Sequence, residues 1–370
     1  HRVHILAWRD LADTEAGGSE VHADHIARRW AEAGLEVVQR TSRAHGQVTD
    51  TRRNGYRVIR RAGRHTVFLD APVQELLHRA GRRDGLLEVW NGLPFFTPLW
   101  ARGRRATFIH HVHADMWRQV MTPGLARLGE ALELQVSPRL YQHTRVLTPS
   151  PSSRLQIIER LGLPAANVTA VPNGVDEQFR PGGTRSPHPR IVTVGRLVVH
   201  KHVERLIGAA AVVRESVPDL ELVVVGQGYD RPNIQRVVND LDARDWVHLR
   251  GHVSDDELVD VLQSAWVIAS ASSDEGWGLS LTEAAACGTP AVATRIAGHI
   301  DAVRDGTSGL LTDGTADALG GALARVLTDS TLRASLRAGA VERASVLSWE
   351  STALGVMRTL AGQATHNQRR

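Results

Sequence analysis

The sequence has 370 residues, of which 42% are hydrophobic and 23% are charged, proportions typical of a globular enzyme of about two domains. It contains no run of about 18 apolar residues that would cross a bilayer, and no N-terminal stretch that resembles a signal peptide. The single cysteine, Cys287, excludes an internal disulfide and favours a reducing, cytoplasmic compartment.

Charge is distributed unevenly along the chain. Residues 1–172 carry 24 arginines against 16 acidic residues, whereas the remainder carries 20 basic against 24 acidic residues. A basic N-terminal half favours an anionic acceptor or peripheral association with an anionic membrane surface; the simpler alternative is a solvated basic surface. Nucleic acid is disfavoured as a partner, because aromatic residues are only 5% and no basic run alternates with aromatics.

Short apolar runs alternate with amphipathic stretches in the first half of the chain, which predicts a parallel sheet with helices on both faces. The predicted strands are 3–8, 35–41, 56–60, 86–90, 106–110 and 145–148. The predicted helices are 18–33, 123–142 and 150–161.

The same alternation restarts after Pro172-Asn173-Gly174. Strands are predicted at 190–194, 220–225, 246–249, 266–270 and 291–294, and helices at 202–215, 231–241, 254–263, 280–287 and from 315. The Pro- and Gly-rich stretch 181–189 has the composition of a linker. The sequence thus predicts two α/β domains facing a cleft, over 1–172 and 173–345. A terminal helix and tail, 346–370, fits either domain.

In open α/β sheets, ligands bind beyond the carboxyl ends of the strands. The most informative segment there is 274–290, where a predicted strand is followed by two glycines and a helix. The tip of a helix binds phosphate, and the flanking Glu275 and Glu283 can accept hydrogen bonds from hydroxyls on either side of it. A nucleotide sugar has this layout. A helix capped by acidic residues, with two unrelated glutamates, is the alternative.

A second segment follows the strand 190–194. Gly195 permits a close turn past a ligand, while Arg196 and Lys201 can reach a diphosphate and stabilise it as a leaving group. Two surface cations are the alternative. Lys201 is the one lysine among 44 basic residues, which favours a specific role for a compact ammonium group.

Two further segments lie at predicted strand ends of the first half. Gly17 and Gly18 open the first helix, where backbone amides can approach a phosphate or sugar; a plain tight turn is the alternative. His110 ends a strand and is followed by His111 and His113. Neighbouring side chains of an extended chain point to opposite faces, so a shared metal ion is disfavoured. We therefore expect His110 to contact a sugar hydroxyl or developing charge.

Three segments are weaker candidates. Asn91-Gly92 follows the predicted strand 86–90, and Asn173-Gly174-Val175-Asp176 lies at the predicted hinge, where Asn173 and Gly174 are explained as a turn. Gly226-Gln227-Gly228 is no dinucleotide fingerprint, because Arg231 stands where a third glycine belongs.

Together these motifs resemble bacterial family 4 (GT4) glycosyltransferases, which are retaining enzymes of the GT-B fold. The resemblance runs from Gly17 to about Thr312. The matching pieces are Gly-Gly-Ser-Glu at 17–20, His110, Asn-Gly-Val-Asp at 173–176, Gly-Arg-Leu…Lys at 195–201, Glu275 and Glu283, Ala-Cys-Gly-Thr-Pro at 286–290, and Asp-Gly-Thr-Ser-Gly-Leu-Leu at 305–311.

The resemblance implies a role for each site residue in binding a nucleotide-diphosphate sugar donor. Arg196 and Lys201 would hold the diphosphate, assisted by the amides of Gly278, Leu279 and Ser280. Glu275 would bind hydroxyls of the transferred sugar and Glu283 those of the ribose. The loop of Gly251, His252 and Val253 would lie near the base, and Gly17–Gly18 would close over the phosphates. The family implies no metal and no further cofactor.

The function expected is transfer of a hexose-type sugar to an acceptor hydroxyl of a glycan, lipid or small molecule. The acceptor would attack the face that the leaving group departs from and give its proton to a phosphate oxygen, because no carboxylate nucleophile is evident. A nucleotide-sugar epimerase and an inactive nucleotide-sugar-binding protein are the alternatives. The enzyme is expected in the cytoplasm, free or at the inner face of the membrane.

Overall fold

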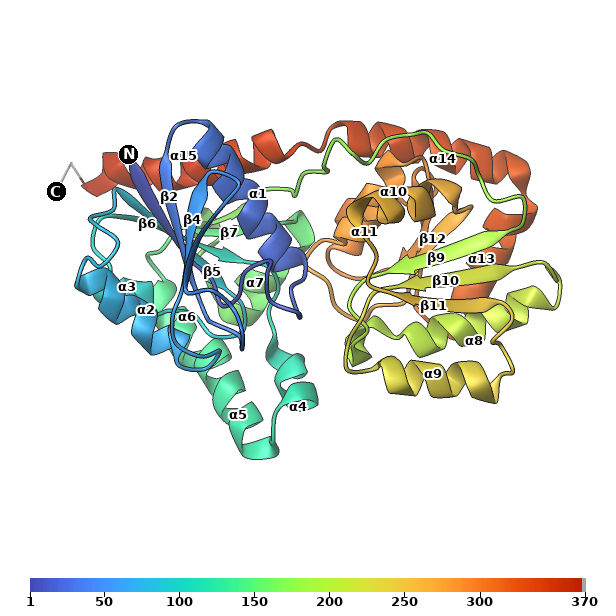
Figure 1. Cartoon of the computed structure of the whole chain (residues 1–370), viewed down its shortest axis with the longest axis horizontal. Helices are drawn as coiled ribbons and strands as arrows, with labels where there is room; N and C mark the ends of the chain where they lie inside the picture. Colours follow the sequence, from blue (N-terminus) through green and yellow to red (C-terminus); the bar gives the residue numbers. More distant parts are fainter. Residues whose placement is uncertain (368–370) are drawn as a thin grey trace. The chain divides into compact units, whose positions relative to one another are not determined.

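The computed structural model describes residues 1–367, which form two compact units (Figure 1). The first unit combines residues 1–174 with the C-terminal segment from Trp349, and the second contains Val175–Ser348. The stretch 181–189 belongs to the second unit, where Trp266 Nε1 donates to the carbonyl of Ser186 at 2.9 Å. Its composition is that of a linker, but it is packed against the sheet.

The first unit contains an eight-stranded sheet with the strand order β3-β4-β2-β1-β5-β6-β7-β8. Its strands are β1 (Arg2–Leu6), β2 (Glu36–Thr41), β3 (Asp50–Arg53), β4 (Tyr56–Arg60), β5 (Gly85–Trp90), β6 (Arg104–Ile109), β7 (Val146–Thr148) and β8 (Val168–Ala170). The order reverses at β1, which has β2 on one side and β5 on the other.

One pair in this sheet is antiparallel, in contrast to the parallel sheet predicted for the first half. Strands β3 and β4 form a hairpin around Asn54-Gly55, whose φ angles are 46° and 85°. A two-residue Asn-Gly turn with both φ angles positive matches the twist of a hairpin. The polar sequence of β3, Asp-Thr-Arg-Arg, lacks the apolar alternation that would have predicted this strand.

Helices cover both faces of the first sheet. They are α1 (Gly18–Glu32), α2 (Val67–Leu76), α3 (Thr97–Trp100), α4 (Trp117–Val120), α5 (Pro123–Ala131), α6 (Ser137–Tyr141), α7 (Pro151–Leu161) and α15 (Trp349–Asn367). The predicted helix 123–142 is thus α5 and α6, joined by a π-helical turn, η2 (Leu132–Val136). Helix α15 adds Ala353, Val356 and Leu360 to the core under α1, and Trp30 Nε1 donates to the carbonyl of Ala353 at 3.1 Å.

The second unit contains a six-stranded parallel sheet with the order β11-β10-β9-β12-β13-β14. Its strands are β9 (Arg190–Val194), β10 (Glu221–Val225), β11 (Val247–Gly251), β12 (Val267–Ser270), β13 (Ala291–Thr294) and β14 (Gly309–Thr312). The order reverses between β9 and β12, which lie side by side.

Alternate residues of these strands fill two cores. Helices α8 (Val203–Arg214), α9 (Arg231–Asp240) and α13 (Ala316–Thr328) pack on one face, over Ile191 and Leu222. Helices α10 (Asp255–Ser264), α11 (Leu279–Ala286) and α14 (Ser330–Ser345) pack on the other, over Val192 and Val223. Short helix α12 (His299–Ala302) follows β13. Two α/β units with parallel sheets confirm the predicted fold class.

Candidate functional site

The predicted donor residues gather at the reversal point of the second sheet. Gly195 and Arg196 follow β9 directly, and the segment from Ser272 to Gly278 follows β12. Because β9 and β12 are neighbours whose connections leave in opposite directions, their carboxyl ends form the switch point at which ligands bind in open α/β sheets. The sequence located these loops at strand ends, and the strand order explains why they are neighbours.

An ion pair between Lys201 and Glu275 joins the two loops. The side chains are 22% and 16% exposed, so the pair is reachable but largely desolvated. Ser272 Oγ donates a second hydrogen bond to Glu275 Oε1 at 2.9 Å. Burial alone raises the pKa of Glu275, but the charges of Lys201 and His299 and the hydrogen bond from Lys201 lower it to about 2. Glu275 is therefore held as a carboxylate.

The turn after β9 is shaped by glycines. A Cβ on Gly195 would lie 3.6 Å from Lys201 Nζ, so the lysine extends along the backbone of this turn. Arg196 is half-buried beside it. Both predicted cations therefore belong to one loop at the end of β9.

Gly226 and Gly228, after β10, pack directly against that loop. A Cβ on Gly226 would lie 1.9 Å from the carbonyl oxygen of Gly195, and one on Gly228 would lie 2.1 Å from that of Leu197. Only glycine permits such a close approach of two backbones. The segment 226–228, a weak candidate in the sequence, thus supports the loop that carries Arg196 and Lys201. Its position directly after a strand is the signal that could have indicated this role.

The loop that is predicted to contact the base, Gly251–Val253, is bonded to the segment after β10. Gly251 has φ +73°, and its carbonyl accepts a hydrogen bond from Gly226 N at 2.8 Å. His252 is exposed and Val253 half-buried. The ends of β9, β10 and β11 are therefore linked through backbone contacts.

The tip of α11 lies beside the Lys201–Glu275 pair. Gly278 precedes the helix with φ +101°, and Leu279 and Ser280 form its first turn, where backbone N–H groups lack partners within the helix. A Cβ on Gly298, after β13, would lie 2.6 Å from the carbonyl oxygen of Glu275. This glycine therefore fixes the loop that carries Glu275, a contribution that no sequence motif indicated.

Glu283 lies one turn into α11 and is half-buried. Burial raises its pKa to about 7, and the nearby carboxylates of Asp255 and Asp176 add to the effect. Glu275 and Glu283 thus differ strongly in charge state although they belong to one helix and its preceding loop. A half-buried acid of this kind is poised to exchange its proton for a hydrogen bond from a ligand hydroxyl.

In the first unit, Gly17 and Gly18 follow the loop after β1, again at a reversal of strand order. Gly17 N donates to Glu20 Oε2 at 2.8 Å, and Arg9 Nε donates to Glu20 Oε1 at 3.4 Å. The amide of Gly17 is thus used within the turn, whereas Gly18 is exposed at the start of α1.

His110 directly follows β6 and is only 7% exposed. Its ring meets that of His22 edge-on, with centroids 4.8 Å apart, and His22 Nδ1 bonds Asn173 Oδ1 at 2.7 Å. Burial lowers the pKa of both histidines, that of His22 to about 3, so both rings are neutral. Among the described residues, His110 Nε2 has no hydrogen-bond partner. A buried nitrogen of this kind calls for a ligand or a solvent molecule.

The other two histidines, His111 and His113, contact each other. The rings of His111 and His113 stack with centroids 4.3 Å apart. Within residues 1–367, no three histidine, cysteine, aspartate or glutamate side chains gather as a potential metal site.

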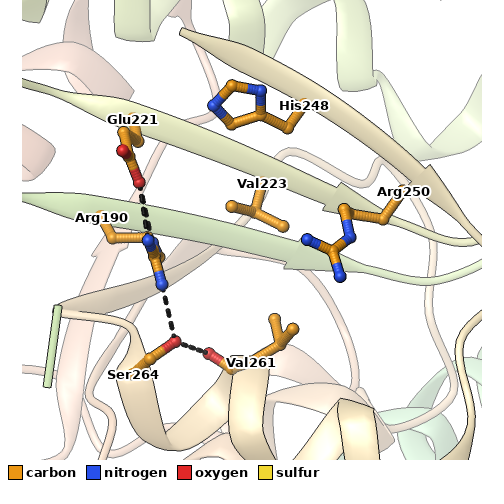
Figure 2. A pocket seen from close by; sticks show the side chains of 7 residues that line it. All are labelled: Arg190, Glu221, Val223, His248, Arg250, Val261 and Ser264. Atoms are coloured by element: carbon orange, nitrogen blue, oxygen red, sulfur yellow. Dashed lines mark hydrogen bonds and ion pairs between the residues drawn. The ribbon is translucent and has the colours of Figure 1, made fainter. Parts of the chain in front are cut away.

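A separate pocket of about 290 Å³ lies in the second unit (Figure 2). Arg190 spans it, donating to Glu221 at 2.8 Å and to Ser264 at 3.1 Å, while His248 and Arg250 line its side at the edge strand β11. Arg190 and Glu221 begin their strands whereas Arg250 lies near the end of β11, so the pocket runs along the strands (Figure 2). It contains none of the predicted donor residues, and we do not assign the donor to it.

Comparison with known proteins identifies the family. Residues 16–179 match the family described as Glycosyltransferase Family 4, and residues 174–343 match Glycosyl transferases group 1. A D-inositol 3-phosphate glycosyltransferase of Frankia alni is 33% identical, over 96% of this chain and 97% of the relative. The chain is a family 4 glycosyltransferase. A similarly named protein of Acidothermus cellulolyticus is 33% identical over 64% of this chain, which spans only 56% of that relative.

Solved structures show the fold of this glycosyltransferase. Sucrose-phosphate synthase of Thermosynechococcus elongatus superposes with a TM-score of 0.83 at 21% identity, covering 99% of both chains. HepE of Anabaena, solved with UDP and glucose, gives 0.77 at 16% identity over 98% of this chain and 99% of its own. The GT-B fold and the enzyme class predicted from the sequence are therefore confirmed. Among residues 1–367 of the glycosyltransferase, no helix combines the length and apolar character needed to cross a membrane.

Proposed function

We propose that this enzyme transfers a hexose-type sugar, with retention, from a nucleoside-diphosphate sugar bound by its second unit to an acceptor hydroxyl. The observation that carries the proposal is the Lys201–Glu275 pair at the β9/β12 reversal, next to the tip of α11. A cation, a carboxylate and unpaired amides there suit a diphosphate with a sugar attached. Structures of HepE with UDP and glucose, or with UDP-glucose, agree with this substrate class.

The cations act on the leaving group. Arg196 and Lys201 neutralise the diphosphate, and the amides of Leu279 and Ser280 donate to its oxygens. Lys201 already has Glu275 as its partner, so it is held in the crevice before donor arrives. Such preorganised donors stabilise the transition state more than flexible ones, because little reorganisation accompanies charge separation.

The two carboxylates recognise hydroxyls. Glu275 is ionised and accepts from hydroxyls of the transferred sugar, and Glu283 accepts from the ribose. The loop Gly251–Val253 adjoins the base. Because Glu283 has a pKa near 7, donor binding couples to loss of its proton, and affinity rises with pH through neutrality.

The reaction breaks the bond between the anomeric carbon and the diphosphate oxygen. The acceptor oxygen bonds to the same face of that carbon, and its proton passes to a phosphate oxygen of the departing diphosphate. We assign to His110, which is neutral and whose Nε2 has no hydrogen-bond partner among the described residues, a hydrogen bond to a hydroxyl of the substrate. No metal or further cofactor is required in this scheme, and the reaction takes place in the cytoplasm.

Product analysis with radiolabelled donor tests the proposal. Purified enzyme is incubated with UDP-, GDP-, ADP- and TDP-glucose, with and without acceptors that include an inositol phosphate, for which the relatives are named. Acceptor-dependent release of nucleoside diphosphate with label in a new α-linked product is expected. Conversion of the donor sugar without acceptor would instead indicate an epimerase, and binding without turnover would indicate an inactive binding protein.

A further inference from the structure

Helix α2 presents an apolar stripe to solvent. Leu69, Val73, Leu76 and Leu77 are 75%, 51%, 57% and 58% exposed, although such residues usually face a core. Their spacing of four, seven and eight residues places them on one side of the helix. The opposite side, with Val67 and Ala71, packs on the sheet. Helix α2 therefore has two apolar sides, one that packs on the sheet and one that faces solvent.

Helix α3 extends this surface. It packs beside α2, where the rings of Phe68 and Phe95 lie 4.9 Å apart, and Figure 1 shows the two helices together. Its Leu99 is 67% exposed. Arg83 lies over the Trp100 ring at 5.6 Å, which ties the segment after α2 to α3.

Arginines follow both helices in the chain. Between residues 69 and 105 the chain has six arginines and four acids, of which Glu75 and Glu88 are buried, whereas Asp70 and Asp84 reach solvent. The exposed arginines that form no ion pair with a described residue are Arg79, Arg82, Arg102 and Arg104. We call these four arginines, with Leu69, Val73, Leu76, Leu77 and Leu99, the α2–α3 surface.

We propose that the α2–α3 surface docks the enzyme on an anionic lipid bilayer. Aliphatic side chains that enter the interface, surrounded by cations that attract lipid phosphates, are the combination by which peripheral proteins hold to anionic membranes. Long arginine side chains can follow the apolar residues while keeping the guanidinium at the headgroups. The charge selects a bilayer over an apolar protein partner, which would leave these arginines desolvated and unpaired.

Co-sedimentation of the full chain with vesicles tests this proposal. We expect binding to vesicles of phosphatidylcholine with phosphatidylglycerol, little binding to phosphatidylcholine alone, and release when salt rises from about 50 to about 500 mM, where screening is strong. Equal binding to both vesicle types, or none to either, would overturn the proposal.

Two double variants separate the contributions of the arginines and of the leucines to vesicle binding. Arg79→Ser with Arg82→Ser is expected to weaken binding to the anionic vesicles by about 25-fold, since each arginine near such a surface contributes about fivefold. Leu76→Ser with Leu77→Ser removes two exposed leucines and is expected to weaken binding at least about tenfold. Leu155→Ser, at a leucine of α7 that is 55% exposed, is the matched control and should bind as the unaltered enzyme does.

Fold and catalysis are monitored in the same samples. All variants alter exposed side chains, so thermal unfolding and turnover of a water-soluble acceptor should match the unaltered enzyme. Vesicle binding by the leucine variant at full strength would refute the docking surface. So would a dimer in sedimentation velocity that dissociates in this variant, because the stripe would then bind a second copy.

Discussion

Replacing Lys201 by alanine is the sharpest test of the donor site. One pKa unit corresponds to about 1.4 kcal/mol, so lowering the pKa of Glu275 from 4.5 to about 2 corresponds to roughly 3 kcal/mol of favourable surroundings. Lys201 supplies the largest part of that lowering. Without it, burial dominates and the pKa of Glu275 rises, so the carboxylate loses both its partner and part of its charge.

Two consequences of Lys201→Ala can be measured independently. Turnover at saturating donor should fall by about 10²–10³-fold if the ammonium group acts as one preorganised donor to the leaving diphosphate. Stability at pH 7 should fall by on the order of 1–3 kcal/mol. Because the folded pKa of Glu275 lies below the unfolded one, the stabilisation is present above pH 4.5 and is lost as pH falls toward 2. The stability difference between the two proteins should therefore shrink below pH 4.5.

The assay is release of labelled sugar, together with denaturant unfolding from pH 3 to 8. Ser272→Ala removes the hydrogen bonds of one hydroxyl, to Glu275 and Ser270, but leaves the Lys201–Glu275 pair in place and should reduce turnover far less. Arg236→Ala, at an exposed position of α9, should leave turnover unchanged. Turnover within about threefold of normal in Lys201→Ala would refute its role in catalysis. A loss of activity explained wholly by unfolding, seen as normal turnover per folded molecule, would refute it equally.

Three further predictions concern other positions. Glu283→Gln should be more stable than the unaltered enzyme at pH 8 by on the order of 1–3 kcal/mol, because a folded pKa of about 7 makes ionisation of Glu283 costly there. In urea titrations, this difference in stability should vanish below pH 4.5. Calorimetry should show that the variant binds nucleoside diphosphate more weakly. Gly226→Ala should lower the free energy of unfolding by about 2 kcal/mol or more, since its Cβ would overlap the carbonyl of Gly195. Gly321→Ala, with open space around it in α13, should raise the free energy of unfolding by about 0.5–1 kcal/mol. Equal shifts of the melting temperature in the two variants would contradict the close packing at Gly226. His110→Ala should lower turnover by about 10²-fold with little change in donor affinity, and a change confined to the KM for donor would argue against an acceptor-side role.

Sequence patterns predicted most of the strands and the loops of the site. Strands such as 190–194 and 291–294 consist mainly of apolar residues because both faces of a parallel sheet are covered, and this makes them recognisable in the sequence. The motif residues Gly195, Arg196 and Glu275 could be predicted because ligands bind beyond the carboxyl ends of strands, and those ends can be recognised in the sequence.

Other features needed the three-dimensional structure. Helix α2 escaped prediction because apolar residues lie on both its buried and its exposed side, so the period of an amphipathic helix is lost, and because Pro72 interrupts the pattern. The close approach of Gly226 to Gly195, and of Gly298 to Glu275, joins residues distant in sequence, so no local pattern could indicate it. The shifted pKa values of Glu275 and Glu283 depend likewise on burial and on neighbours from other elements.

The return of the last helix to the first unit has a consequence for biosynthesis. Val356 and Leu360 of α15 lie in the core of the first unit, and Leu360 packs against Gly85 of β5. A ribosome delivers these side chains only after the whole of the second unit, so the first half emerges with an uncovered apolar surface. The second unit is contiguous and can complete its core earlier. The half that leaves the ribosome first is thus the last to mature, and during that interval it is the half that most needs a chaperone.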